Sequence, residues 1–270
     1  MTGIKKRSVI AVTVLLLGMS LMVYAGGRLA ETQQTYQQGN EAYEYLREQI
    51  KGSVPNTVGP PTENVTPGLE PPQENTGEPS VYIPSLDINF EKLKSINKDA
   101  AAWLYCPDTV IDYPIMRAND YNYYLNRLPD GTNNSNGSLF LDFNCSPDFS
   151  DQLSVIYGHN MKSGSMFGSL KGYKDQKYYE KHPYMYLYTE QGNYRIDLIY
   201  GCVIAAGKWR ERAFMFEENL GELIAYAANN TTFNSGINYT EGDRIIALST
   251  CSYEFDDARY VVLGILTPEY

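Results

Sequence analysis

The sequence predicts a mainly β domain in its C-terminal part, folded as an eight-stranded closed or nearly closed barrel. Three observations predict it. Eight short runs rich in β-branched and aromatic residues follow one another after residue 81, and turn-forming clusters such as PDGTNNSNG and EQGN separate them. Only one long helical pattern interrupts these runs, late in the chain.

The expected strands are, in chain order, Ala102–Tyr105, Val110–Met116, Ser138–Phe143, Leu153–Tyr157, Tyr184–Thr189, Tyr194–Ala206, Arg244–Thr250 and Tyr260–Leu266. Two short helices are expected, one after Asn89 as N-cap through Ile96 and one over Asp120–Leu125. A longer helix is expected over Glu217–Ala228, between the sixth and seventh strands. It has an acidic start and an apolar i, i+3, i+4, i+7 pattern formed by Leu220, Leu223, Ile224 and Ala227.

The first 28 residues are predicted to be an uncleaved membrane anchor. Lys5, Lys6 and Arg7 precede an uncharged, mostly apolar run from Ser8 to Ala25, which is typical of a secretory signal or of an N-terminal anchor with its basic end inside the cell. As a helix, Val9–Ala25 would be roughly 26 Å long, close to the thickness of a hydrocarbon core. A cleaved signal peptide is the alternative, because residues 23–25 resemble a cleavage site. In both cases the rest of the chain is exported.

Residues 29–80 are predicted to be a stalk followed by a linker. Residues 29–50 are polar, with a weak helical pattern. Residues 51–80 hold seven of the fourteen prolines and almost no large apolar side chain, so they cannot bury enough surface to offset the entropy of ordering. We expect an extended linker that holds the folded domain, residues 81–270, clear of the membrane.

Charge and cysteine content narrow the function classes. The net charge of −10 excludes a nucleic-acid partner, because phosphate binding requires a basic face. The four cysteines contain no CxxC pair, which is unlike a zinc site, and Cys202 should be a buried thiol in a strand. An even number of cysteines in an exported chain could form two disulfides, but if Cys251 is a free thiolate the other three cannot all pair, so no essential disulfide is expected. No metal or cofactor is expected either. The aspartates Asp142, Asp148 and Asp151 are irregularly spaced, which favours a solvated loop over a calcium site.

The strongest candidate site combines Cys251 with Arg259. Cys251 ends an apolar run and Arg259 precedes the next one, with the short segment SYEFDDA between them. This pattern predicts an antiparallel hairpin, in which residues that flank the loop face one another. A permanent cation would then lie beside a thiol, where it could stabilise an oxyanion.

A thiol also needs a partner that accepts its proton, since only a few per cent of an ordinary cysteine is thiolate at pH 7. The chain has two histidines. His159 follows an apolar run in VIYGHNM, where a ring would be exposed on a rigid support. His182, before a proline among charged residues, is expected to be a solvated loop residue.

The motifs YGHN with His159, SMFGSLKGYKDQKYYEKHP, and LSTC with Cys251 followed by Arg259 resemble the sortase family, most closely its class B. The resemblance runs from about Phe90 to the C-terminus. It implies an eight-stranded barrel with N-terminal helices and a helix between the sixth and seventh strands. It also implies a membrane-bound, extracellular cysteine transpeptidase.

The resemblance further implies that Cys251 attacks the Thr carbonyl of a surface protein's sorting signal and that an amine of a cell-wall precursor accepts the acyl group. His159 would transfer protons and Arg259 would hold the oxyanion or the substrate backbone. By the same resemblance, three further residues match substrate-groove positions of class B sortases: Leu125, Tyr157 and Ser249.

Departures from the family's pattern leave the sorting signal open between an NPxTx-like and a PPxTG-like pentapeptide. Ala247 stands where the family often has Thr, Ser252 where class B relatives can have Glu, and the segment around Trp209 matches poorly. Two other function classes stay open: an L,D-transpeptidase-like acyl-transferase, although no SxGC motif is present, and a non-catalytic adhesion or pilus-associated domain. A papain-like protease is excluded, because its cysteine precedes its histidine.

Overall fold

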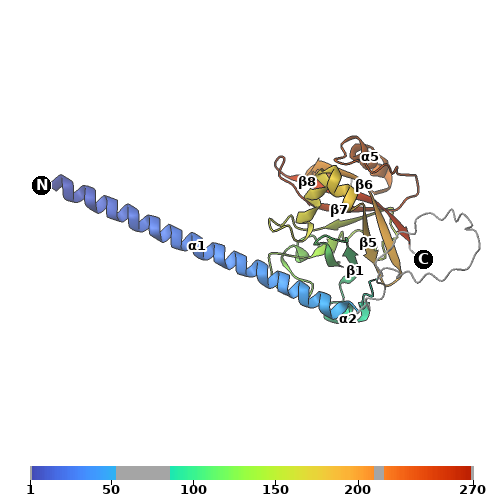
Figure 1. Ribbon diagram of the computed structural model, residues 1–270, viewed down its shortest axis with the longest axis horizontal. Helices are drawn as coiled ribbons and strands as arrows, with labels where there is room; N and C mark the ends of the chain where they lie inside the picture. The colour runs from blue at the N-terminus through green and yellow to red at the C-terminus, as the bar shows by residue number, and fades with distance from the viewer. Residues whose placement is uncertain (1, 53–85, 210–215, 269–270) are drawn as a thin grey trace, which may run out of the picture.

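Eight strands close into one barrel in the computed structural model, which describes residues 2–52, 86–209 and 216–268 (Figure 1). The strand order around the barrel is β1-β2-β3-β4-β7-β8-β6-β5. All neighbours are antiparallel except the β2–β3 and β4–β7 pairs, which are parallel. The expected mainly β barrel is therefore confirmed.

The strands lie close to the predicted runs. Their bounds are β1 Ala100–Tyr105, β2 Asp112–Met116, β3 Leu139–Leu141, β4 Leu153–Tyr157, β5 Tyr184–Tyr188, β6 Asn193–Ala205, β7 Ile245–Cys251 and β8 Ala258–Pro268. The third strand is shorter than expected. Its end is set by Asp142, whose Oδ1 accepts a hydrogen bond of 2.9 Å from the backbone N–H of Asn144 and so begins a turn.

The helices confirm two predictions and change a third. Helix α2, Phe90–Ile96, is capped by the Asn89 side chain, which accepts from the Lys92 N–H. Helix α5, Phe216–Asn229, lies between β6 and β7 as expected. The helix predicted over Asp120–Leu125 is instead a short 3₁₀ turn, η1, at Tyr123–Asn126. The sequence did not predict the 3₁₀ segment η2, Phe167–Lys174, or helix α3, Gln176–Lys181.

Both faces of the central strands are buried, which explains why their sequences read as continuous apolar runs. Ile156, Leu248 and Val262 belong to the main core cluster, and they are paired across β4, β7 and β8. The next residue back on each strand belongs to a second cluster, which also holds Leu223 and Ala227 of α5. Helix α5 thus covers the outer face of the sheet that carries the site described below.

The longest helix is α1, Thr2–Ile50. Its C-terminal end packs against the barrel, and its N-terminal part projects away from the barrel (Figure 1). Tyr43, Leu46 and Ile50 are 2%, 7% and 0% exposed, respectively. Tyr43 Oη donates to the Gly137 carbonyl at 2.6 Å, and Lys51 pairs with Asp112. Residues 29–50 are therefore not a free stalk over their whole length, because their last part is packed into the core of the domain.

The residues that flank the predicted linker are hydrogen-bonded to each other. Lys51 and Ile88 form an antiparallel bridge, and the Gly52 N–H donates to the Asp87 carbonyl at 3.0 Å. Residues 53–85 lie outside the described part of the chain. The expectation that they form an extended spacer therefore stays a prediction.

The predicted anchor, residues 1–28, lies partly outside the description, which omits residue 1 and the side chains of 2–12 and 14. Among the residues that could be assessed, no helix has an apolar stretch long enough to cross a membrane.

Candidate active site

Two parallel strands, β4 and β7, end side by side and carry the candidate histidine and cysteine. Tyr157 is in register with Ser249, so His159 and Cys251 each lie two residues beyond a paired position and on the same face as it. The alignment continues past the last paired residues. Thr250 Oγ1 donates to the Gly158 carbonyl and Asn160 Nδ2 donates to the Cys251 carbonyl, both at 2.7 Å.

The third candidate, Arg259, faces Cys251 directly. The two residues are partners in the antiparallel β7–β8 ladder, as the hairpin pattern predicts. Cys251 is exposed, while one guanidinium nitrogen of Arg259 donates to the Ala258 carbonyl at 3.0 Å. Asp257, with a positive φ of 60°, forms the turn before this strand, and its carbonyl accepts from the Ala206 N–H at 2.8 Å. This hydrogen bond holds the turn that precedes Arg259 and so fixes the backbone position of Arg259 opposite Cys251.

The ring of His159 is held from below by the chain around η1. Its Nε2 lies 2.5 Å from the Leu125 carbonyl oxygen. Gly137, at φ +60°, packs under the ring: a Cβ there would lie 2.5 Å from the Leu125 oxygen and 3.0 Å from His159 Cδ2. Only glycine fits this position, on grounds of both conformation and space.

All six residues predicted for the site line one pocket, of about 340 Å³. Its walls come from the end of β4, the end of β7, the start of β8 and the segment before η1. The pocket also holds residues that sequence reasoning did not assign to it, among them Tyr121, Asn122, Phe140 and Trp209. Most of these are aromatic, so the pocket combines an apolar wall with the thiol, the imidazole and the guanidinium.

Two polar atoms in this pocket are buried without a hydrogen-bond partner among the described residues. Ser249 Oγ and Trp209 Nε1 belong to side chains that are 1% and 3% exposed. An unpaired buried polar group is costly, and binding sites are where such groups are retained. Trp209 had only been noted for its poor match to the family. A tryptophan at the edge of a strand-to-helix connection was the one signal that could have pointed to it.

Asp142 is a correction to the sequence analysis. It was expected in a solvated loop, but it is 0% exposed and accepts hydrogen bonds from Tyr157 Oη at 3.0 Å and Tyr121 Oη at 3.2 Å. Asp148 is exposed as expected, and Asp151 accepts from Ser146 at the start of the same loop. The burial of Asp142 follows from two tyrosines that are distant in sequence, which no local pattern reveals.

The loop between Cys251 and Arg259 is fastened to η2. Lys174 Nζ forms an ion pair with Glu254 and lies 3.2 Å from Ser252 Oγ, and Ser252 Oγ also donates to Glu254. Although partial burial raises it, these hydrogen bonds lower the pKa of Glu254 to about 2. The loop thus carries a carboxylate that stays ionised under all ordinary conditions.

The other reactive side chains are enclosed. Burial raises the pKa of the Cys145 and Cys202 thiols to about 12, and that of Cys106 also lies above its usual value. Cys202 is buried in β6, as expected. His182 ends α3, is half-buried and lies 4.6 Å from the Tyr178 ring, so it is not the solvated loop residue that the sequence suggested.

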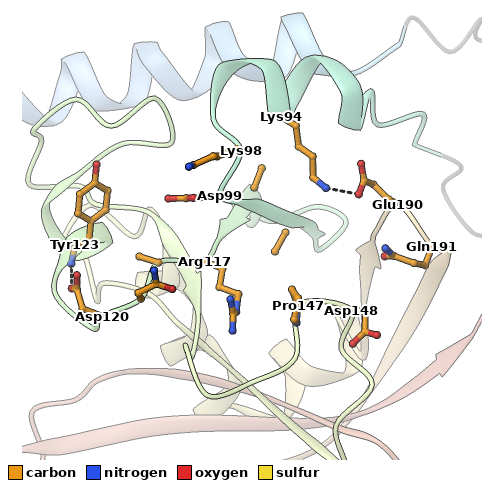
Figure 2. Close-up of a pocket in the computed structure, with 14 residues that line it drawn as sticks. Lys94, Lys98, Asp99, Arg117, Asp120, Tyr123, Pro147, Asp148, Glu190 and Gln191 are labelled. Carbon is orange, nitrogen blue, oxygen red and sulfur yellow. Dashed lines mark hydrogen bonds and ion pairs between the residues drawn. The ribbon is translucent and has the colours of Figure 1, made fainter.

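Figure 2 shows a larger cavity, of about 650 Å³, whose lining does not include Cys251. Its charged lining includes Lys94, which pairs with Glu190, together with Arg117 and Asp148. None of the six predicted site residues reaches it. The residues that line this cavity include no cysteine and no histidine, so a choice by volume alone would miss the predicted site.

Comparison with known proteins places this geometry in a family, although no protein-family model matches the chain. Sortase B of Listeria monocytogenes serovar 1/2a (strain ATCC BAA-679 / EGD-e) is 32% identical over 177 residues, which cover 64% of this chain and 72% of the relative. Sortase B of Staphylococcus aureus (strain NCTC 8325 / PS 47) is 28% identical over 178 residues, covering 65% and 73%.

Solved structures agree. The 2.0 Å crystal structure of S. aureus sortase B has a TM-score of 0.63 at 26% identity and covers 68% of this chain and 88% of its own. An S. aureus sortase B–substrate complex has a TM-score of 0.62 at 27% identity, covering 67% and 86%, and so does a sortase B complexed with Gly3. The family groups enzymes of the Gram-positive cell envelope. On this evidence the chain belongs to the sortase B family and is a cysteine transpeptidase of the sortase type.

Proposed function

We propose that this enzyme cleaves the C-terminal sorting signal of surface proteins after Thr and transfers the acyl group to an amine of a cell-wall precursor. One observation carries the proposal: a thiol, an imidazole and a guanidinium from three strand ends open into a single pocket. Within the described chain, Cys251 is also the exposed thiol, while the others are buried.

In this scheme the proton of the Cys251 thiol passes to His159, and the sulfur attacks the carbonyl carbon of the Thr residue. The tetrahedral oxyanion collapses to a thioester as the peptide C–N bond breaks, and His159 donates the proton that the departing amine needs. An incoming amine then loses a proton to His159 and displaces the sulfur. Arg259, paired with Cys251 across β7 and β8, has the charge and reach to hold the oxyanion.

The proposed peptide contacts are Leu125, Tyr157 and Ser249. Their position around the thiol supports this role. Ser249 Oγ adds a chemical argument, because a buried hydroxyl without a partner can bind a backbone or side-chain group of the peptide. The aromatic and aliphatic wall would enclose the apolar part of the signal, such as a proline ring.

The titles of related structures support both proposed partners. One describes a sortase B–substrate complex and another a sortase B complexed with Gly3, which is a short peptide with a free amine. These ligands belong to those proteins. For this chain they favour a peptide donor and an amine acceptor over hydrolysis alone.

We also propose that residues 1–28 anchor the enzyme in the cell membrane, with residues 81–270 as the extracellular catalytic domain. The support is the basic cluster at Lys5–Arg7 followed by the apolar run that ends at Ala25. Fractionation of cells that express the full chain, followed by proteolysis of intact protoplasts, tests it. Recovery of the chain in the soluble fraction would contradict it.

The function is tested by incubating the full chain with pentapeptides of the NPxTx and PPxTG types and triglycine as the amine. Intact-mass spectrometry should detect a thioester on Cys251, and chromatography should detect the peptide–triglycine product. Cys251→Ala and His159→Ala should abolish the product, with a loss of at least about 10³-fold. His182→Ala is the matched control and should keep full activity. Absence of a thioester with every peptide would contradict the proposed sorting signal and the proposed cleavage after Thr.

A further inference from the structure

The segment from Arg117 to Asn126, here called the wall segment, separates two cavities. Tyr121, Asn122 and Leu125 line the substrate pocket, whereas Asp120 and Tyr123 line the larger polar cavity on the other side. Figure 2 shows Arg117, Asp120 and Tyr123 around that second space. Tyr124 is buried in a core cluster, and Tyr121 and Leu125 pack against that cluster. Specific hydrogen bonds add to this packing and fix where the segment lies between the two cavities.

Backbone hydrogen bonds hold the wall segment, among them one from the Ser138 N–H to the Tyr124 carbonyl at 2.9 Å, and three of its side chains add further attachments. At its start, Arg117 donates to the carbonyls of Phe143 at 2.9 Å and Cys145 at 3.2 Å. Near its end, Tyr124 Oη donates to Asp99 at 2.9 Å. In the middle, Tyr121 Oη reaches both carboxylate oxygens of Asp142 at 3.2 Å.

Asp142 is a charged residue in a fully buried position, which is uncommon in proteins. It is wholly buried, and no ion pair within the described residues includes it. Its charge is therefore met by hydrogen bonds from Tyr121, Tyr157 and Asn144. A buried carboxylate is costly unless such donors surround it, so the arrangement is strongly defined.

We propose that Asp142 is a positioning residue of the substrate pocket, which ties the wall segment to the end of β4 by accepting hydrogen bonds from Tyr121 and Tyr157. The inference rests on the proposed function of this pocket. Tyr121 belongs to the wall and Tyr157 lies two residues before His159, so one carboxylate joins the two sides of the pocket. The two rings are 6.0 Å apart in an edge-to-face contact.

The tie has two consequences for the site. Both tyrosine hydroxyls are directed to Asp142, so the rings offer the substrate apolar surface. Burial, followed by the charge of Asp142, raises the pKa of both tyrosines, which keeps them as proton donors to the carboxylate. The same wall segment carries the Leu125 carbonyl beside His159 Nε2, so its position also bears on the imidazole.

The test compares Asp142→Asn with Asp197→Asn in the full chain. Both aspartates are buried and hydrogen-bonded. The tyrosines that bind Asp142 line the pocket, whereas Arg195 and Thr267, which bind Asp197, do not. Asp142→Asn should raise KM for the sorting peptide about tenfold, and because the Leu125 carbonyl beside His159 belongs to the same segment, kcat should fall as well, by a smaller factor. Asp197→Asn should lower the Tm while leaving KM unchanged. Tyr121→Phe, which removes only a hydroxyl, should raise KM in the same direction.

Hydrogen exchange provides a readout that does not depend on activity. Peptides that cover residues 117–126 should exchange faster in Asp142→Asn and Tyr121→Phe, but not in Asp197→Asn. Unchanged exchange in the first two variants, or equal acceleration in Asp197→Asn, would overturn the proposal. If the wild type formed no thioester, the proposed function would fail, while the exchange comparison would still decide whether Asp142 holds the wall segment.

Discussion

Replacing Ile50 with alanine tests whether the end of α1 is part of the folded domain. Ile50 is 0% exposed and packs with Trp103 and Leu93, 43 or more residues away in sequence. Removing its side-chain carbons loses their burial and leaves a cavity, which together cost about 2–5 kcal/mol in the free energy of unfolding. For a domain of this size, such a loss lowers the Tm by roughly 5–15 °C.

Leu29→Ala is the matched control on the same helix. Leu29 is 60% exposed, so its replacement should change the free energy of unfolding by less than about 0.5 kcal/mol. Both variants are measured in the full chain by differential scanning calorimetry and by urea denaturation. Equal midpoints for Ile50→Ala, Leu29→Ala and wild type would show that α1 does not dock in solution, and the reasoning from burial would be refuted.

Three further predictions concern the site. Trp209→Phe should leave the Tm unchanged or slightly higher, because it removes a buried N–H donor that has no partner among the described residues. The same change should raise KM for the sorting peptide about tenfold if that donor binds the substrate. An unchanged KM would exclude this role. Iodoacetamide should label the native protein once, at Cys251, whereas unfolded protein should also be labelled at the three buried thiols, Cys106, Cys145 and Cys202. Glu254 has a pKa lowered from 4.5 to about 2, so its pairing with Lys174 stabilises the fold at neutral pH and this stabilisation is lost as the pH falls from 4.5 towards 2. The Tm difference between wild type and Glu254→Gln should therefore shrink over that interval, and a difference that is constant with pH would contradict the assignment.

The barrel and the pairing of Cys251 with Arg259 could be predicted because their signals are local. The runs that became β4, β7 and β8 are apolar and bounded by turn residues, and the candidate side chains sit where those runs end. A short connection between β7 and β8 then requires Cys251 and Arg259 to meet. Parallel pairing of β4 with β7, which brings His159 alongside, is non-local and was supplied only by the resemblance to a family.

Other features depend on contacts that the sequence hides. The docked end of α1 carries a stripe of Tyr36, Tyr43 and Ile50 at seven-residue intervals, a signal that the surrounding polar residues obscured. Asp142 was expected to be solvated because Asp142, Asp148 and Asp151 are irregularly spaced, yet tyrosines from two other segments bury it. Local composition therefore did not predict the burial of either segment, because that burial depends on residues that are distant in the sequence.

The joined ends of residues 53–85 have a consequence for how the enzyme could vary. Because Gly52 and Asp87 are hydrogen-bonded, insertions or deletions between them alter neither the direction nor the distance of α1 from the barrel. Doubling the length of such an excursion costs only about 0.6 kcal/mol in closure entropy. The distance between the N-terminus of α1 and the barrel is therefore set by the 49-residue helix, which is roughly 74 Å long, and not by the number of residues between Gly52 and Asp87.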